Sequence, residues 1–224
     1  MLKAALLNRN TLYSVCNFVV GGIFAVIITI TLTSCGENRF PETEPIEQAR
    51  SNYEALESAQ LIILDSDLEV IQSFRFKYEG DTLTYLLWAT DGEEVYAEYY
   101  NGLRLCHGKQ GDNDWTVLTR GDNGYYTYNR ISKHPFTQKS LFFFDEASAS
   151  YIEEDFVVHY NTDILNRRSK NEPVQNLTTT FTINEYITVY EFNSDINSYT
   201  IYISDINDVD IIEQPDFSEA LAMN

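Results

Sequence analysis

The chain has 224 residues, of which 34 are acidic and 15 are basic, and its formal net charge is −19. Nucleic acids and anionic membrane surfaces would be repelled by this charge, so neither is expected as a partner. Hydrophobic residues make up 44% of the chain and aromatic residues 14%, which indicates a packed core and excludes a largely disordered chain.

The N-terminal region has the order of a secretory signal, with basic residues first, then an apolar run, then small residues. Lys3 and Arg9 come first, and no charged residue follows until Glu37. The apolar run from Phe18 to Leu32 would span about 22 Å as a helix, less than the roughly 30 Å hydrocarbon core of a bilayer. A cleaved signal fits this run better than a retained helix, and either one places the rest of the chain outside the cytoplasm.

The apolar run ends in Leu32-Thr33-Ser34-Cys35, which resembles a bacterial lipobox. Such a box consists of an aliphatic residue, two small residues and the cysteine that takes a diacylglyceryl group before cleavage. We predict a signal peptide over residues 1–34 that is cleaved between Ser34 and Cys35. The mature protein is then an extracytoplasmic bacterial lipoprotein, held on the cell membrane by the lipid on Cys35, which includes palmitate. Ordinary cleavage and an uncleaved anchor are the alternatives.

The sequence contains no constellation that is typical of catalysis. There is no nucleophile elbow, no H-E-x-x-H zinc motif and no Gly-rich phosphate loop, and the three histidines are scattered. Once Cys16 is assigned to the signal and Cys35 to the lipid, Cys106 is left without a disulfide partner. We therefore predict that the protein is not an enzyme and has no catalytic residues, no metal site and no cofactor.

Residues 35–45 are mostly polar and contain two prolines, which predicts a short extended tether between the lipid and a single domain over residues 46–224. The first predicted element of this domain is a helix over residues 46–56. Apolar residues recur there at helical spacing with no helix breaker between them; they are Ile46, Ala49, Tyr53 and Leu56.

From Ala59 onward, short segments rich in β-branched and aromatic residues alternate with turn signals, which predicts an antiparallel meander. The Asn101-Gly102 pair is typical of a two-residue hairpin turn, and such a turn would set Cys106 opposite Ala97 as a buried, inert thiol. The predicted strands of this meander cover residues 60–64, 70–78, 83–89, 94–100 and 103–107, with a further short strand around residues 115–118.

The hairpin over residues 70–89 has only one register that keeps apolar residues opposite one another. A two-residue turn at Gly80-Asp81 gives this register, whereas a slip by one residue would set apolar residues opposite polar ones. The predicted pairs are Tyr78 with Leu83, Phe76 with Tyr85, and Phe74 with Leu87.

Residues 135–152 break the alternation. The apolar run 141–144, followed by Ala147, Tyr151 and Ile152, predicts a helix with a broad apolar face. Beyond it the sequence predicts a second meander with a polar loop over residues 164–175; its strands cover residues 156–160, 177–183, 187–192 and 199–203.

The closing segment from Tyr202 to Pro215 is similar to that of bacterial lipoproteins with the lipoprotein-localisation-factor fold. In both, a final strand ends in S-D-x-N and is followed by an aliphatic pair and a proline. The resemblance implies an α+β fold in which a curved antiparallel sheet, a half-barrel, packs over a few helices with a cavity between them. Some members of that family carry lipids or lipoproteins.

Two classes of function stay open at this point. The first is a membrane-anchored lipoprotein that binds an apolar ligand such as a lipid between the sheet and the helices. The second is a non-enzymatic surface module that contacts protein or an envelope polymer. An open apolar cavity favours the first, and a filled core with an exposed aromatic patch favours the second. The residues predicted to contact an apolar ligand are Phe74, Phe76, Tyr85, Leu87 and Phe143.

Overall fold

The computed structural model describes residues 40–91, 94–109, 116–122, 142–169 and 172–214. The helical elements among them are α2 (Thr43–Asn52), η1 (Tyr53–Ala55) and α5 (Thr162–Arg168). The strands are β1 (Ser58–Leu64), β2 (Val70–Glu79), β3 (Thr82–Asp91), β4 (Glu94–Tyr100), β5 (Arg104–Lys109), β6 (Thr116–Thr119), β7 (Ala149–Ile152), β8 (Val157–Tyr160), β9 (Leu177–Asn184), β10 (Tyr186–Ser194) and β11 (Ser198–Ser204).

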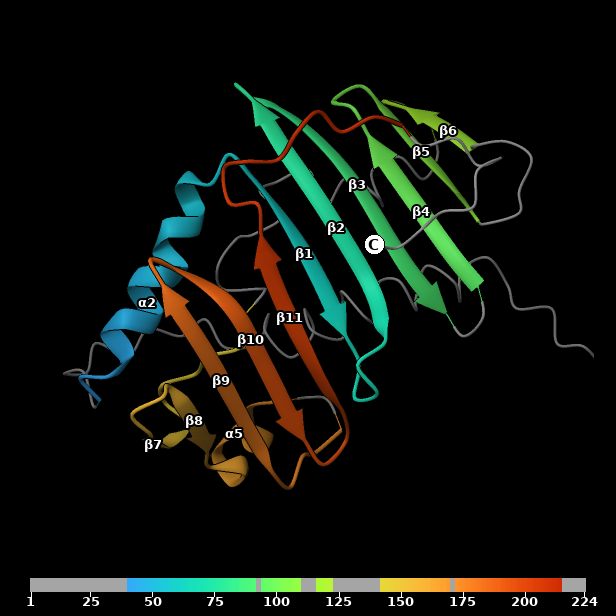
Figure 1. The fold of residues 1–224 in the computed structure, drawn as a ribbon. Coiled ribbons are helices and arrows are strands. Elements are labelled where there is room, and N and C mark those ends of the chain that lie inside the picture. The colour runs from blue at the N-terminus through green and yellow to red at the C-terminus, as the bar shows by residue number, and fades with distance from the viewer. Residues whose placement is uncertain (1–39, 92–93, 110–115, 123–141, 170–171, 215–224) are drawn as a thin grey trace, which may run out of the picture.

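The two predicted meanders form one antiparallel sheet of eleven strands, in the order β6-β5-β4-β3-β2-β1-β11-β10-β9-β8-β7 (Figure 1). The join is made by β1, which pairs with β2 on one side and with β11 on the other. Among the described strands the sheet does not close, because β6 and β7 are its two edges. The prediction of a large antiparallel sheet accompanied by a few helices is confirmed.

The predicted signal peptide, Ser34 and Cys35 lie outside the described residues, so cleavage and lipidation stay predictions from the sequence. No helix in the described part of the chain is both long and apolar enough to cross a membrane.

The first helix forms as its apolar spacing predicts, but it begins at Thr43, three residues before the predicted start at residue 46. The Thr43 hydroxyl donates to the carbonyl of Phe40 at 2.9 Å, and the Thr43 N–H reaches the same carbonyl at 3.1 Å. Pro45 fits in the first turn, where a helix needs no N–H donor. The helix packs on β9 and β10 and buries Ile46 and Ala49, and Tyr53, the first residue of η1, is buried next to it.

The register of the β2–β3 hairpin is the predicted one. Phe76 lies opposite Tyr85, and the two pairs on either side of it follow the same alternation. Because side chains alternate between the two sides of a strand, the apolar and the basic residues of β2 lie on opposite faces of the sheet. We call the side that carries Phe74 and Phe76 the inner face of the sheet. The side that carries Arg75 and Lys77 is the outer face.

The predicted pairing of Cys106 is wrong by two residues. Cys106 lies opposite Tyr99, whereas Ala97 pairs with Gly108. A shift of two residues leaves the face unchanged, so Cys106 is still buried, at 2% exposure, and burial raises the pKa of its thiol.

The shift arises because the turn is longer than two residues. The side-chain oxygen of Asn101 accepts the N–H groups of Leu103, at 3.2 Å, and of Arg104, at 2.9 Å. This cap widens the loop, and Gly102 takes a φ of +86° within it. A Cβ on Gly102 would lie 2.5 Å from the Thr82 methyl carbon, so the position requires glycine.

The predicted helix over residues 135–152 is wrong wherever the structure describes it, which is from Phe142 onward. Residues 142–145 are irregular, residues 146–148 form a turn, and β7 follows. The backbone N–H of Phe143 is held by the Tyr190 hydroxyl at 3.2 Å, and the Phe143 carbonyl accepts from the hydroxyls of Tyr160 and Tyr190 at 3.4 Å each. The tyrosine hydroxyls thus form the hydrogen bonds that the Phe143 backbone would form in a helix. The segment can therefore stay irregular, with its phenylalanine side chains packed on the inner face.

The predicted polar loop over residues 164–175 begins instead with the helix α5. The Asn161 side chain caps this helix by accepting the N–H of Ile164 at 3.2 Å, and Leu165 is buried. The cap is visible in the sequence as an asparagine just ahead of the segment.

Candidate functional site

Four of the five residues predicted to contact a ligand come together on the inner face of β2 and β3. The ring of Phe74 lies 6.0 Å from that of Phe76 and 5.5 Å from that of Tyr85, centroid to centroid. Leu87 is the partner of Phe74 across the two strands. All four side chains are buried, with exposed fractions between 0% and 8%. We call these residues the β2–β3 cluster.

Phe143 belongs to the same core but lies on the other half of the sheet. Its ring contacts Tyr160 of β8, at 5.1 Å, and Phe192 of β10, at 6.4 Å. The structure therefore separates Phe143 from the other four predicted residues, and it places Phe143 over the strands on which α2 packs.

The inner face changes from apolar to polar between β3 and β5. Leu87 of the β2–β3 cluster lies opposite Glu98 of β4, and Glu98 in turn lies opposite His107 of β5. The Tyr85 hydroxyl donates to the Glu98 carboxylate at 2.5 Å, so one residue of the cluster is bonded directly to this acid. The inner face is therefore apolar on β2 and β3 and carries the acid Glu98 on β4.

Glu98 was not singled out from the sequence, although a signal existed. On β4, residues 94, 96, 98 and 100 are Glu, Tyr, Glu and Tyr, and they all share the face of Leu87. When one face of a strand carries alternating acids and tyrosines and the next strand is apolar on that face, the pattern predicts that the apolar surface ends between the two strands.

Burial raises the pKa of Glu98 to about 7, against a smaller lowering by the Tyr85 hydrogen bond. The folded protein therefore binds a proton that the unfolded chain has already released. The contribution of Glu98 to the free energy of unfolding is largest below pH 4.5, decreases by at most about 3 kcal/mol as the pH rises to about 7, and is constant above that pH.

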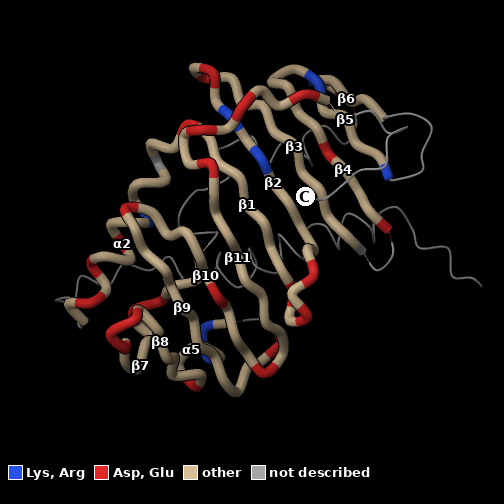
Figure 2. Tube along the Cα trace, in the orientation of Figure 1, with Lys and Arg blue, Asp and Glu red and all other residues tan. Residues whose placement is uncertain are grey.

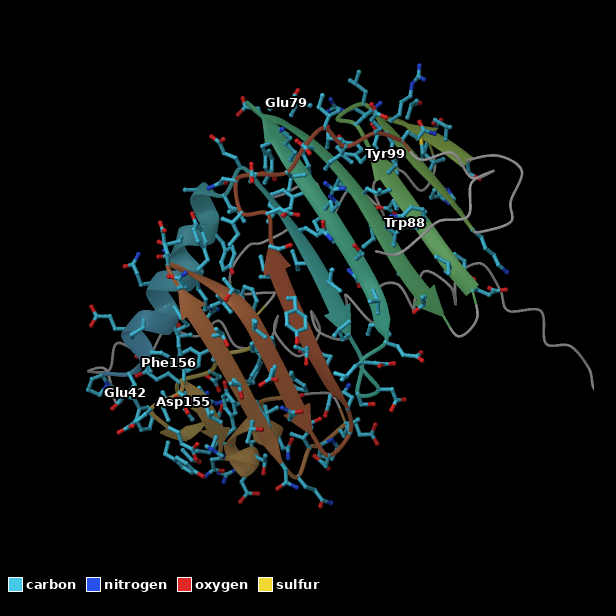
Figure 3. All side chains as sticks on the ribbon, viewed as in Figure 1. Glu42, Glu79, Trp88, Tyr99, Asp155 and Phe156 are labelled. Atoms are coloured by element: carbon cyan, nitrogen blue, oxygen red, sulfur yellow. The ribbon has the colours of Figure 1, made fainter. Side chains whose placement is uncertain are left out.

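We expect the variant Glu98→Gln to lose this decrease, because its side chain does not ionise. The measurement is the free energy of unfolding in urea at pH 4.5, 6 and 8. The exposed Glu79 at the end of β2 (Figure 3) is the matched control, and Glu79→Gln should keep the pH dependence of the parent protein. A parallel pH dependence in Glu98→Gln and the parent would show that the pKa of Glu98 is the same in the folded and the unfolded protein.

Gln72 carries a buried hydrogen-bond acceptor that has no donor. Its side chain lies on the inner face between Ala89 of β3 and Ile63 of β1 and is 6% exposed, and its amide oxygen has no hydrogen-bond partner in the described part of the chain. An orphaned buried acceptor costs about 1–3 kcal/mol. Since Ala89 presents only a methyl group, the space beside this oxygen is bordered by a small side chain.

The closing segment after β11 lies across the outer face (Figure 1). The Asn207 N–H donates to the carbonyl of Ser58 at 2.8 Å, and the N–H of Val209 donates to the Ser58 hydroxyl at 3.1 Å. Val209 and Ile212 are buried in a small cluster on this face, together with Tyr99 and Cys106. The acidic residues of this segment therefore belong to a structural strap, and the S-D-x-N motif supplies its first turn.

The described histidines have no ligand arrangement. The ring of His159 stacks on Tyr151 at 4.2 Å and lies 3.0 Å from the Glu153 carboxylate, while His107 faces inward from β5. Among the described residues there is no group of three or more His, Cys, Asp or Glu side chains that could hold a metal ion.

Comparison with known proteins gives no family for this chain: no protein-family model matches it, and no curated protein matches it. Among solved structures it is similar to LprF from Mycobacterium bovis, with a TM-score of 0.46 and 9% identity over 80% of this chain and 99% of that one. It is also similar to the hypothetical protein CT021 from Chlamydia trachomatis, with a TM-score of 0.23 and 12% identity over 66% of this chain and 85% of that one. Neither TM-score is high enough to establish a shared fold, so the function has to be argued from the residues of this chain.

Proposed function

We propose that the protein is a membrane-anchored extracytoplasmic lipoprotein that binds a lipid or a similar apolar molecule on the inner face of β1–β4. The observation that carries this proposal is the orphaned amide oxygen of Gln72 within an apolar layer. A ligand with a hydroxyl or N–H group would supply the missing donor, and its hydrocarbon part would contact the β2–β3 cluster.

The polarity of the inner face supports an amphipathic ligand. Apolar side chains cover β1 to β3, and the Tyr85–Glu98 pair begins the polar border. A hydrocarbon chain is stabilised by about 25 cal/mol for each Å² of apolar surface that it removes from water. The carboxyl group of Glu98 and the net charge of −19 favour a neutral or cationic head group over an anionic one.

The predicted lipid anchor at Cys35 would hold the domain next to a membrane, which is a source of lipid ligands. A tether of about ten residues keeps the domain within a few nanometres of the membrane to which the lipid would hold it. Acyl chains are the apolar molecules most abundant at that place. A ligand that reaches Gln72 has to enter a buried apolar layer, so the ligand itself has to be largely apolar.

The direct test is native mass spectrometry of the full-length protein purified from its own membranes. We expect a non-covalent adduct with the mass of a lipid, which is released on denaturation while the lipid on Cys35 is retained. If the protein carries no such adduct and takes up none from added neutral lipid vesicles, the proposal is wrong.

The substitution Gln72→Met gives a second test, with opposite effects on stability and binding. Methionine has a similar length and no polar acceptor, so the free energy of unfolding should increase by about 1 kcal/mol. Lipid occupancy should decrease at the same time, because the ligand loses its acceptor. Both are measured on one preparation, by urea unfolding and by native mass spectrometry.

Gln60 of β1 provides the matched control, since it lies on the outer face opposite Arg75. Gln60→Met should leave lipid occupancy unchanged. If Gln72→Met instead destabilises the protein and keeps its lipid, Gln72 has a structural partner and the binding site lies elsewhere.

A further inference from the structure

The outer face carries an arginine whose Nε–H has no hydrogen-bond partner among the residues that the structure describes. Arg75 of β2 lies between Gln60 of β1 and Leu86 of β3, and it is half-buried. Its Nε–H is buried and has no acceptor in the described structure. In a chain with 34 acidic residues and 15 basic ones, an unpaired guanidinium in the middle of a sheet is unexpected, because burying a donor without an acceptor is costly.

The neighbouring cation, Lys77, does have a hydrogen-bond partner, so the lack of one is particular to the position of Arg75. Lys77 lies on the same face two residues along β2, and its amine donates to the carbonyl of Val209 in the closing segment at 2.8 Å. The strap thus satisfies Lys77 but not Arg75. Figure 2 shows basic residues on β2 in the middle of the sheet, with acidic residues mostly toward the strand ends and loops.

Beside Arg75, a row of side chains crosses the outer face from β4 to β11. In register, Ala97 faces Trp88, Trp88 faces Ser73, Ser73 faces Ile62, and Ile62 faces Tyr202. Trp88 is half-buried on β3 (Figure 3), and Tyr202 is 44% exposed. Three strand spacings separate these two aromatic residues, which is about 14 Å.

This row has the form of a flat platform. Between its two aromatic residues, Trp88 and Tyr202, lie the buried Ser73 and the half-buried Ile62. Trp88 and Arg75 are diagonal neighbours on adjacent strands, about 7 Å apart. A molecule that lies along the row therefore presents one edge to the guanidinium of Arg75.

The geometry distinguishes a sugar chain from a peptide. A peptide commonly binds by adding a strand to a sheet edge or by laying a helix in a groove, and the backbone groups of these central strands are already paired with each other. Sugar rings have apolar faces that stack on flat aromatic side chains, and their substituents form hydrogen bonds with polar side chains such as that of the half-buried Gln60. The guanidinium of Arg75 would attract an anion, and a carboxylate matches its planar fork.

We propose that the outer face of β11, β1, β2 and β3 binds an envelope polysaccharide that carries carboxylate groups, with Arg75 paired to a carboxylate and Trp88 and Tyr202 stacked on sugar rings. This site is separate from the inner face, so the two proposals stand or fail independently. The net charge of −19 limits how densely charged the polysaccharide can be. A sparsely charged chain can approach, whereas a densely charged one is repelled.

The experiment uses full-length protein in detergent micelles and polysaccharide extracted from the envelope of the cells that produce it. One half of the extract is carboxyl-reduced, which converts acidic sugars to neutral ones without altering the chain. Affinity electrophoresis in gels that contain either half gives the apparent Kd. We expect the native extract to retard the protein and the reduced extract to bind at least tenfold more weakly.

The variants assign the contacts. Arg75→Gln should raise the apparent Kd for the native extract at least tenfold and leave that for the reduced extract unchanged. Trp88→Ala and Tyr202→Ala should weaken the binding of both. Arg120→Gln removes the same charge at an exposed turn after β6 and should have no effect. Melting curves of each variant exclude unfolding as the cause, and Tyr202 is exposed enough for its truncation to be tolerated.

Three results would overturn the proposal. The first is a native extract that does not retard the protein at all. The second is an Arg75→Gln variant that binds the native extract as the parent does. The third is retardation by a poly-glutamate peptide with the same dependence on Arg75 and none by the extract, which would assign the surface to an acidic protein partner.

Discussion

Phe76→Ala should lower the free energy of unfolding by about 3–5 kcal/mol, among the largest effects that a single truncation in this fold can have. Phe76 has no exposed surface, and its ring contacts those of Phe74 and Tyr78. Removing it leaves a cavity in the middle of a sheet whose neighbouring strands cannot move together without breaking their ladders. For a chain of this size the melting temperature should decrease by about 6–20 °C.

Tyr202→Ala is the matched comparison, because it removes an aromatic ring from the same sheet on the opposite face. Tyr202 is 44% exposed, so its loss should cost about 1 kcal/mol or less. Both variants are measured by urea unfolding with the same slope. If the two cost the same, the assignment of inner and outer faces is wrong.

Cys35→Ser should abolish both lipid labelling and membrane attachment. The prediction rests on the Leu-Thr-Ser-Cys sequence that closes the N-terminal apolar run. Only the cysteine thiol accepts the diacylglyceryl group, and two acyl chains give stable attachment where one chain is marginal. The measurement is incorporation of an alkyne-bearing fatty acid in growing cells, followed by separation of membrane and soluble fractions.

Cys16→Ser is the control, since Cys16 precedes the predicted cleavage site and leaves with the signal. This variant should be labelled as strongly as the parent protein. Undiminished labelling of Cys35→Ser, or loss of labelling in Cys16→Ser, would refute the lipobox assignment.

The sequence determines the β2–β3 hairpin well because several constraints agree there. The alternation in residues 74–78 and the turn at Gly80 permit one register, and a slip would expose apolar side chains. The β4–β5 hairpin has the same kind of signal, but the Asn101 side chain lengthens its turn. A turn motif fixes that a hairpin forms, whereas the loop length depends on side-chain hydrogen bonds that periodicity does not reveal.

The apolar run 141–144 shows where periodicity fails. Adjacent phenylalanines fit a helix as well as an irregular segment, and only the tyrosine hydroxyls of β8 and β10 decide between them. The candidate sites have the same limitation. Gln72 and Arg75 are ordinary polar residues of a strand in the sequence, and their missing partners become evident only when every neighbour is in place.

The position of β1 has a consequence for the order of folding. β1 is among the first elements of the domain to be made, yet one of its two neighbours is β11, and about 130 residues lie between them. β1 cannot complete its pairing until all of these residues have crossed the membrane and β11 has become available. During that time its free edge offers unpaired backbone groups to any passing strand. The domain therefore depends on protection of this edge until the last strand arrives, and truncations that remove β11 should aggregate rather than give a smaller folded domain.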